Sequence, residues 1–245
     1  MAKQSKEAWK TYANVFDAFT MRNLTWLEAQ GTFDRLTQAI EVGKEANVFV
    51  AESESGKVIV KIYRLENCNF NKMFEYLKGD PRFPSLKPRR REIVFAWTLR
   101  EYRNILVARN AHVNVPTPII QHKNILVEEF IGEDSAAPKL KDVGFDDKTI
   151  ATCFKDTMKE LRKLWHKAGI VHGDLSGFNI LYHNNKPVII DFSQATSIKD
   201  SRAREYLERD AKNLATFFTK RGFDCTADEI VAIILKKPKE STKTE

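Results

Sequence analysis

Apolar residues recur at helical spacing over the first part of the chain. They stand at Trp9, Tyr12, Val15, Phe16, Phe19, Leu24, Leu27, Phe33 and Leu36, mostly three or four positions apart. Apolar residues spaced in this way form one face of an amphipathic helix. We therefore expect the first forty residues to be mostly helical and to form an N-terminal extension.

The pattern then changes to one typical of strands. Residues 47–52 and 57–63 are rich in β-branched side chains, and Ser53–Gly56 between them has the composition of a tight turn. Two such runs joined by a short turn predict a β-hairpin.

A segment rich in charge and in proline follows over residues 66–91. It contains Gly79, Pro81, Pro84 and Pro88, which disfavour regular structure, so we expect a long mobile loop. The next residues, roughly 91–110, have a strong helical pattern, and residues 117–130 resemble a second hairpin.

The remainder of the chain is mainly helical in pattern. A helix is expected from about Asp146 to a stop at Gly169, then strand-like runs at 170–172, 179–182 and 188–191, then further helices with a capping box at Thr226 and Glu229. We expect four segments: a helical extension over 1–40, a β-rich lobe over 41–131, an α-rich lobe over 132–235, and a frayed polar tail over 236–245.

Composition narrows the class of protein. Hydrophobic residues make up 42% of the 245 positions and charged residues 30%, and no apolar run approaches the ~20 residues of a membrane span. The three cysteines are far apart, so we expect no disulfide framework, and the polar N-terminal residues lack a secretory signal. We therefore expect a cytoplasmic protein with no membrane partner. The net charge of +7 permits an anionic partner such as RNA or a nucleotide.

One constellation of residues carries the chemistry. The run His172-Gly-Asp174-Leu-Ser-Gly-Phe-Asn179 is followed by Asp191, twelve residues after Asn179. This order and spacing resembles the catalytic loop and the metal-binding motif of protein kinases. In that arrangement Asp174 orients the attacking hydroxyl, while Asn179 and Asp191 offer oxygen ligands to Mg²⁺.

The first hairpin carries a lysine among apolar neighbours. Lys61 shares a strand face with Ile59 and Tyr63, where an unpaired charge would be costly. A kinase supplies it with nucleotide phosphates and a glutamate of the following helix. Glu92 and Glu101 are both candidates on opposite helix faces; we favour Glu101 because Trp97 and Ile105 lie on its side.

The phosphate-binding loop departs from the usual protein-kinase pattern. In place of three glycines, the stretch before the hairpin has one, in Gly43-Lys44-Glu45. Backbone amides from Gly43 onward would still cradle phosphate, and Lys44 would add charge.

Several motifs together identify a family resemblance. They are GKEANVF from Gly43, VKIYR around Lys61, REYRN at 100–104, EEFIGE at 128–133, HGDLS with Asn179, IDFSQA from Ile190, and YLERDAKNL at 206–214. Taken together, from about residue 9 to 235, the chain resembles the RIO family of atypical protein kinases. It is similar to the branch without a winged-helix domain, in the minimal form seen in archaea.

The resemblance implies a fold, an activity and roles for residues. The fold would be α/β, with two lobes, a truncated second lobe and added N-terminal helices. Lys61 would bind ATP, Glu129 and Ile131 would meet adenine, Asp174 would be catalytic, and Asn179 and Asp191 would hold Mg²⁺, with Mn²⁺ as a substitute. The aspartate matching Asp191 can become phosphorylated during ATP hydrolysis in this family. The resemblance also implies a protein substrate, the protein itself as a substrate, and a partner in the maturing small ribosomal subunit and its RNA.

Two other functions compete with this interpretation. A small-molecule kinase of the aminoglycoside or choline type shares the HGDLxxxN motif, but the sequence lacks an extended helical substrate lobe. A non-catalytic assembly scaffold is the other rival, and the complete set of Lys61, Asp174, Asn179 and Asp191 argues against it. No APE motif follows Asp191, so the docking surface for a protein substrate is reduced.

Overall fold

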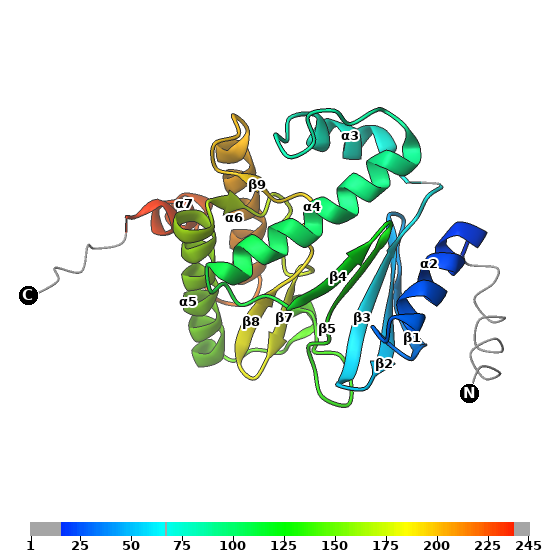
Figure 1. The fold of residues 1–245 in the computed structure, drawn as a ribbon. Coiled ribbons are helices and arrows are strands. Elements are labelled where there is room, and N and C mark those ends of the chain that lie inside the picture. Colours follow the sequence, from blue (N-terminus) through cyan, green and yellow to red (C-terminus); the bar gives the residue numbers. More distant parts are fainter. Residues whose placement is uncertain (1–15, 67, 238–245) are drawn as a thin grey trace, which may run out of the picture. The chain divides into compact units, whose positions relative to one another are not determined.

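The structure is a computed structural model that describes residues 16–66 and 68–237. These residues form two compact units (Figure 1). The first unit comprises the described residues up to Leu106 together with Pro116–Phe130, and the second comprises Val107–Val115 together with the described residues from Ile131. The finer division that the sequence predicts, with its extension and tail, stays a prediction.

A five-stranded antiparallel sheet is the centre of the first unit. Its strands are β1 (Arg35–Val42), β2 (Ala46–Ser53), β3 (Gly56–Tyr63), β4 (Pro118–His122) and β5 (Ile125–Glu129), in the order β1-β2-β3-β5-β4. The predicted hairpin is present as β2 and β3, joined by a two-residue turn, and the second predicted hairpin is β4 and β5. The register places Lys61 opposite Val48 on one side and Leu126 on the other.

Helix α2 (Ala18–Ala29) packs its apolar residues against this sheet. Leu24 and Leu27 are fully buried in a cluster with the alternate strand residues Val58, Val60 and Ile62. The helix begins at Asp17, whose carboxylate accepts the amides of Phe19 and Thr20 as an N-cap.

The helical expectation for the first forty residues is only partly correct. Helix α2 is present, but residues 35–42 form the edge strand β1. The apolar spacing of Phe33 and Leu36 continued the helical pattern, although these two side chains are buried by the sheet. Pairing with β2 therefore overrides the local pattern here. Trp9, Tyr12 and Val15 lie outside the described residues.

The segment 66–91 also differs from the expected irregular loop. Residues Phe70–Lys78 form helix α3, with Asn69 as its N-cap and Gly79 at its C-cap. Met73, Tyr76 and Leu77 are buried on one side of it. The prolines that predicted a loop all follow Gly79, so they end the helix and do not prevent it.

Helix α4 (Arg90–Asn110) follows, as the sequence predicts, and a buried polar network joins it to the end of α3. Asp80 accepts from Arg82 at 2.6 Å and from Arg100 at 3.2 Å, and Arg82 also donates to Asn104 at 2.9 Å. Burial opposes ionisation of Asp80, but the hydrogen bonds and charge of Arg82 and the charge of Arg100 outweigh it and lower its pKa.

Helices dominate the second unit. The elements are α5 (Asp147–Lys163), its one-turn π-helical continuation η2 (Leu164–Ala168), α6 (Ala203–Thr219) and α7 (Ala227–Leu235), with the short helix η1 (Leu140–Asp142). The strands β6 (Ile170–Val171) and β9 (Thr196–Ser197) form one pair, and β7 (Ile180–His183) and β8 (Lys186–Ile189) form a hairpin.

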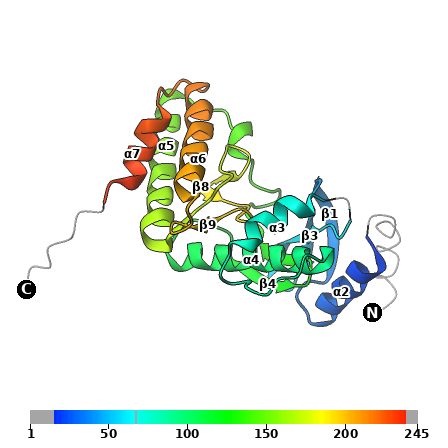
Figure 2. The same ribbon diagram turned by 90° about the horizontal axis from the view of Figure 1, so that it is seen from above.

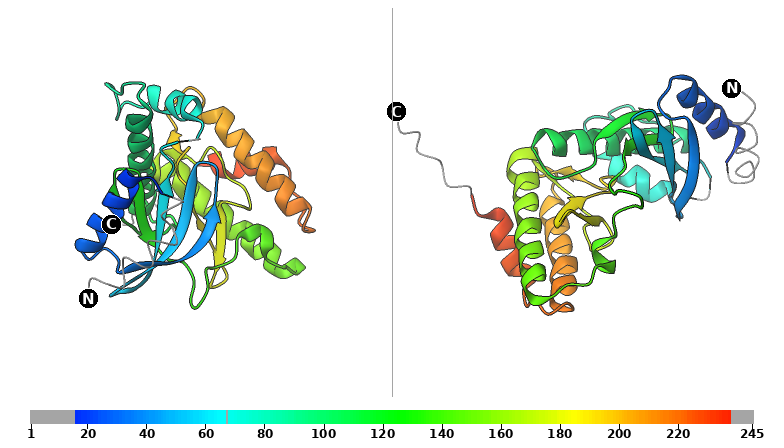
Figure 3. Two further views of the ribbon diagram at one scale, coloured as in Figure 1. Left: turned by 90° about the vertical axis from the view of Figure 1, so that its right-hand side faces the viewer. Right: turned by 90° about the horizontal axis from the view of Figure 1, so that it is seen from below.

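Helices α5, α6 and α7 lie side by side (Figures 2 and 3). Phe154 of α5 packs edge-on against Phe218 of α6, with ring centres 5.1 Å apart. The predicted stop at Gly169 is present, with φ of 67°, and so is the predicted capping box of Thr226 and Glu229. Within the described part of the chain, no helix has the length and apolar character needed to cross a membrane.

Candidate active site

Lys61 and Glu101 form a nearly buried ion pair in the first unit. Lys61 lies on β3 and Glu101 on α4, and the ammonium Nζ is 2.8 Å from Oε1 of the carboxylate. The side chain of Glu101 is 1% exposed and that of Lys61 is 12% exposed. The pairing that the sequence predicts is therefore present, while the binding of ATP by Lys61 stays a prediction.

Tyr63 completes this arrangement on the same face of β3. Its hydroxyl donates to the other carboxylate oxygen of Glu101. Glu92, the alternative partner, is 41% exposed and pairs instead with Arg89. Both oxygens of Glu101 are thus used, and the carboxylate fixes the position of the lysine that faces it.

The turn between β1 and β2 contains the predicted phosphate-binding residues. The amide of Gly43 donates to the carbonyl of Ala46 at 3.0 Å, so this amide already has a partner within the turn. A Cβ at Gly43 would lie 2.8 Å from the same carbonyl oxygen, which explains the glycine. Lys44 is exposed, and the carbonyl of Glu45 accepts from the amide of Arg64. Phosphate binding by Gly43, Lys44 and Glu45 stays a prediction.

The two residues predicted to meet adenine lie at the end of β5 and just beyond it. Glu129 ends β5 in the first unit, and its carboxylate accepts from the amide and the hydroxyl of Thr117. Ile131 begins the following segment of the second unit, and its carbonyl accepts from Ala137 at 2.9 Å. Their contact with adenine stays a prediction.

A buried aspartate binds the backbone of the predicted catalytic loop, residues 172–179, in the second unit. Asp210 of α6 is 4% exposed and accepts the amides of Gly173 and Leu175, each at 2.8 Å. These amides flank Asp174, so the backbone of that residue is fixed on both sides. Burial raises the pKa of the Asp210 carboxyl above its usual range.

The side chain of Asp174 is oriented by a glutamine. Gln194 donates from Nε2 to Oδ2 of Asp174 at 2.9 Å. Asn179 donates from Nδ2 to the backbone carbonyl of Asp174 at 2.8 Å, so its amide oxygen points the other way. The loop thus brings together Asp174 and Asn179, two of the residues that the sequence predicts for the site.

Asp191 follows β8 and has a strained backbone. Its φ is 64°, in the left-handed region that few residues other than glycine adopt. The hydroxyl of Ser193 donates to Oδ1 of Asp191 at 2.9 Å, and the amide of Ile190 donates to the carbonyl of Asn179. Strain of this kind is concentrated at functional sites, where the surrounding structure maintains it.

Asn179 and Asp191 are suitable ligands for magnesium. Mg²⁺ takes oxygen ligands and is commonly held by one or two side chains together with phosphate oxygens and water. The amide oxygen of Asn179 and the carboxylate of Asp191 supply such a donor set on adjoining segments. Among the described residues no group of three or more His, Cys, Asp or Glu is placed to hold a metal.

Sequence patterns alone do not identify three residues that support the site, which are Asp210, Gln194 and Ser193. Asp210 and Gln194 stand within the motifs that carry the family resemblance. Nothing local in the sequence assigns Asp210 to partners 35 and 37 residues away, or Gln194 to one 20 residues away. Ser193 stands where the protein-kinase metal motif has glycine at its third position. Its hydroxyl contact with Asp191 gives that departure a physical role.

The fold belongs to the protein-kinase-like class. The structure is similar to that of the Rio2 kinase from Chaetomium thermophilum, with a TM-score of 0.66 and 22% identity, covering 87% of this chain and 67% of that one. It is also similar to the ADP/Mg²⁺-phosphoaspartate complex of that kinase, with a TM-score of 0.64 and 22% identity, covering 87% and 66% of the two chains.

Sequence comparison identifies the family within this class. The RIO domain model matches residues 47–230. The RIO-type serine/threonine-protein kinase Rio1 of Haloferax volcanii is 36% identical over 236 residues, which cover 96% of this chain and 80% of the relative. The chain belongs to the RIO family of atypical serine/threonine protein kinases.

Proposed function

We propose that this protein transfers the γ-phosphoryl group of ATP, in a magnesium-dependent reaction, to a serine or threonine hydroxyl of a protein or of itself. The observation that carries the proposal is the hydrogen bond from Gln194 to Oδ2 of Asp174 at 2.9 Å. It holds one carboxylate oxygen, so that the carboxylate has a fixed orientation toward an incoming hydroxyl.

The residues of the second unit would have different roles in the phosphoryl transfer. Asp174 accepts a hydrogen bond from the attacking hydroxyl and orients its oxygen toward the γ-phosphorus. Mg²⁺, held by Asn179 and Asp191, would neutralise the charge on the phosphates. Asp210 and Ser193 hold the backbone and the side chain of these residues in place before substrate arrives.

Lys61 would bind the phosphates of the nucleotide. Glu101 and Tyr63 fix its position, and its charge would complement the α- and β-phosphates. The exposed Lys44 of the β1–β2 turn and the backbone beyond it would add further phosphate contacts, while Glu129 and Ile131 would bind adenine through the backbone.

A second reaction is favoured by the position of Asp191. The related Rio2 kinase has been observed as a phosphoaspartate with ADP and Mg²⁺. If Asp191 attacks the γ-phosphorus, a bond forms between its carboxylate oxygen and phosphorus while the bond to the β-phosphate oxygen of ADP breaks. Water then cleaves the acyl phosphate, releases phosphate and restores Asp191. The protein would in that case act as an ATPase switch.

A single-turnover reaction with γ-labelled ATP tests both reactions. Label that survives acid indicates a phosphohydroxyl, and label that hydroxylamine removes indicates an acyl phosphate on Asp191. Asp174→Asn should prevent acid-stable labelling, because it removes the carboxylate that orients the hydroxyl. The proposal fails if wild-type protein with Mg²⁺ yields neither label and no free phosphate.

We further propose an assembling small ribosomal subunit, including its RNA, as the partner, and the cytoplasm as the location. The net charge of +7 and the exposed cluster of Lys87 and Arg89–Arg91 support an RNA contact. Membership of a protein-kinase family argues against a small-molecule substrate, and the ordered set of Asp174, Asn179 and Asp191 argues against a scaffold without activity.

A further inference from the structure

A row of lysines runs along α5 in the second unit. Lys155, Lys159, Lys163 and Lys167 follow one another at intervals of four residues, the last within η2. Four residues of helix rise about 6 Å, so the Cα atoms of consecutive lysines lie about 6 Å apart along the helix axis. Lys155, Lys159 and Lys167 are exposed, and Lys163 is partly exposed.

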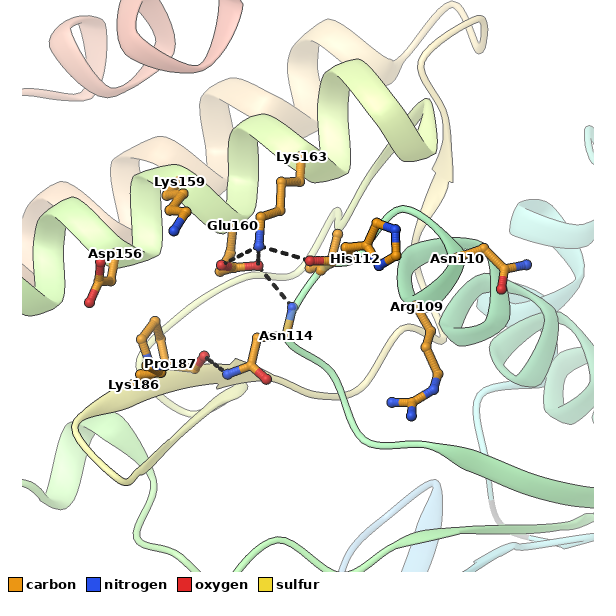
Figure 4. Close-up of a pocket in the computed structure, with 11 residues that line it drawn as sticks. Arg109, Asn110, His112, Asn114, Asp156, Lys159, Glu160, Lys163, Lys186 and Pro187 are labelled. Carbon is orange, nitrogen blue, oxygen red and sulfur yellow. Dashed lines mark hydrogen bonds and ion pairs between the residues drawn. The ribbon is translucent and has the colours of Figure 1, made fainter.

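Two adjoining hollows flank this row. The first has a volume of 690 Å³ and lies between α5, the end of α4 and the β7–β8 turn (Figure 4). Arg109, Lys159 and Lys186 line it from these three elements. The second, of 760 Å³, is lined by all four lysines of the row. The hollows share Lys159 and Lys163, so together they form one continuous basic surface.

Most cations of this surface have no partner in the described part of the chain. Neither a hydrogen bond nor an ion pair involves the side chain of Arg109, Lys155, Lys159, Lys167 or Lys186 among the residues that the structure describes. The close-up in Figure 4 draws no interaction from Arg109 or Lys159. Five exposed charges are therefore available to a ligand.

Neighbouring cations with a structural role differ clearly from these. Lys163 donates to the carboxylate of Glu160 and to the carbonyl of His112 at 2.8 Å. Arg162 and His166 bond to the carbonyls of Ile233 and Ile234 in α7.

The acidic groups near the row do not cancel its charge. Glu160 accepts from Lys163 and also from the amide of Asn114 at 2.8 Å, so that carboxylate is already neutralised. Asp156 is the one other carboxylate that lines either hollow among the described residues. The surface thus carries an excess of positive charge.

We propose that this surface of α5, the end of α4 and the β7–β8 turn binds the phosphodiester backbone of a nucleic acid strand. Phosphates recur at a regular ~3.4 Å rise per strand, so every second phosphate recurs close to the ~6 Å interval of the lysines. The row extends about 18 Å along the helix, which is longer than a single phosphate group requires. An acidic peptide is the alternative ligand, and the competition experiment below distinguishes it from a nucleic acid.

This surface is distinct from the residues of the proposed phosphoryl transfer. None of its cations belongs to the set around Asp174, Asn179 and Asp191, and the inference does not depend on that reaction. It shares with the proposed function only the class of partner, and it assigns a second contact surface in addition to the arginine cluster 89–91.

The test is binding of a short labelled oligouridylate to the full chain over a series of KCl concentrations, read by fluorescence anisotropy. Lys155→Gln, Lys159→Gln and Lys167→Gln are combined in one variant. Each lost contact with a single strand reduces the slope of log K against log salt by about 0.7, so the slope should fall by about two. Arg109→Gln with Lys186→Gln should reduce it by about a further 1.4.

The matched control combines Lys199→Gln, Lys212→Gln and Lys220→Gln, exposed lysines of the same unit that do not line either hollow. This variant has the same net charge as the first and should retain the wild-type slope. Circular dichroism and thermal melting establish that both variants fold. If the salt slope fell equally in the two variants, the change in net charge alone would explain it, and the proposal would be overturned.

Competitors determine which ligand chemistry the surface recognises. An oligothymidylate of the same length should compete about as well as RNA, since the backbone is common to both. Polyglutamate of equal charge, or inorganic phosphate at the same phosphate concentration, should compete poorly; efficient competition by either would overturn the proposal. If only Arg89→Ala with Arg90→Ala and Arg91→Ala flattens the slope, this surface is not the site, while the partner proposed above stands.

Discussion

Gln194 and Asp174, twenty residues apart in the sequence, are joined by a 2.9 Å hydrogen bond from the amide Nε2 to the carboxylate Oδ2. The glutamine touches Asp174 and is itself 8% exposed. In the proposed phosphoryl transfer it would be a positioning residue, which acts on the hydroxyl substrate through the aspartate.

Replacing Gln194 by leucine should lower the turnover number for phosphoryl transfer by a factor of about ten to a hundred. A hydrogen bond to a charged group contributes about 1.5–3 kcal/mol, and 1.4 kcal/mol corresponds to a factor of ten in rate. The dissociation constant for ATP should stay at the wild-type value, measured by a fluorescent nucleotide. Gln121→Leu, at a surface position of β4, is the matched control. A change in ATP affinity with unchanged turnover would contradict the positioning role.

Asp191→Asn should reduce Mg²⁺-dependent ATP turnover about a hundredfold or more, because the metal and the acyl-phosphate reaction both lose their carboxylate. Asparagine tolerates the left-handed φ of 64° better than most residues, so the backbone is kept. The control is Asp224→Asn, an exposed aspartate between α6 and α7. Hydrolysis at the wild-type rate in the Asp191 variant would remove this residue from the site.

Glu101→Gln should lower the free energy of unfolding by about 3 kcal/mol, because removing one partner of a buried ion pair leaves the other uncompensated. It should also weaken ATP binding, since Lys61 loses the group that fixes it. Urea unfolding measures the first effect. Glu92→Gln, on the exposed side of the same helix, should change stability by less than about 0.5 kcal/mol. Equal effects of the two substitutions would show that the buried pair has no special contribution.

The free energy of unfolding should fall at low pH because Asp80 becomes protonated. Its folded pKa is lowered, so the stabilisation that it provides is fully present above its unfolded pKa of about 3.9 and is lost as pH falls through the folded value. Asp80→Asn should therefore be less stable than the wild type from neutral pH down to about 4, and the difference should shrink below that. Urea midpoints across this pH range provide the measurement. A difference that stays constant into strong acid would mean that ionisation of Asp80 is not the cause.

Replacing Arg89, Arg90 and Arg91 together by alanine should remove up to three phosphate contacts with RNA. Each lost contact with a duplex should reduce the slope of log K against log salt by about 0.9. The structure also shows Arg90 over the ring of Phe70 and Arg91 over that of Phe19. Melting temperature separates the two roles. A lower melting temperature with an unchanged salt slope would make these arginines part of the packing between helices.

The motif of the candidate site could be recognised because its residues lie in a short stretch of sequence. Asp174 and Asn179 are five residues apart in one loop, and Asp191 follows across the β7–β8 hairpin, whose turn contains Asn184 and Asn185. The Lys61–Glu101 pair was also predictable, since strand alternation and helix periodicity together left only two glutamates to consider. The protein-kinase-like fold followed from the order of these motifs.

Features that depend on contacts between segments far apart in the sequence were not predictable in the same way. Leu36 is the one buried residue of strand β1, and the pairing of this strand with β2 decides its structure. Helix α3 was concealed by the prolines that follow it, although Asn69 and Gly79 marked its ends. The contacts of Gln194 and Asp210 require two segments that local patterns treat separately.

The anchoring of the catalytic loop by Asp210 affects how variants and relatives of this protein are interpreted. An alanine scan that measured activity alone would assign Asp210 to the catalytic set, although it binds backbone amides and lies 4% exposed beneath the loop. Conversely, a homologous chain could keep Asp174, Asn179 and Asp191 and still be inactive if this one buried carboxylate were replaced. Recognition of degenerate members of the family from sequence should therefore include the anchor as well as the residues that face the nucleotide.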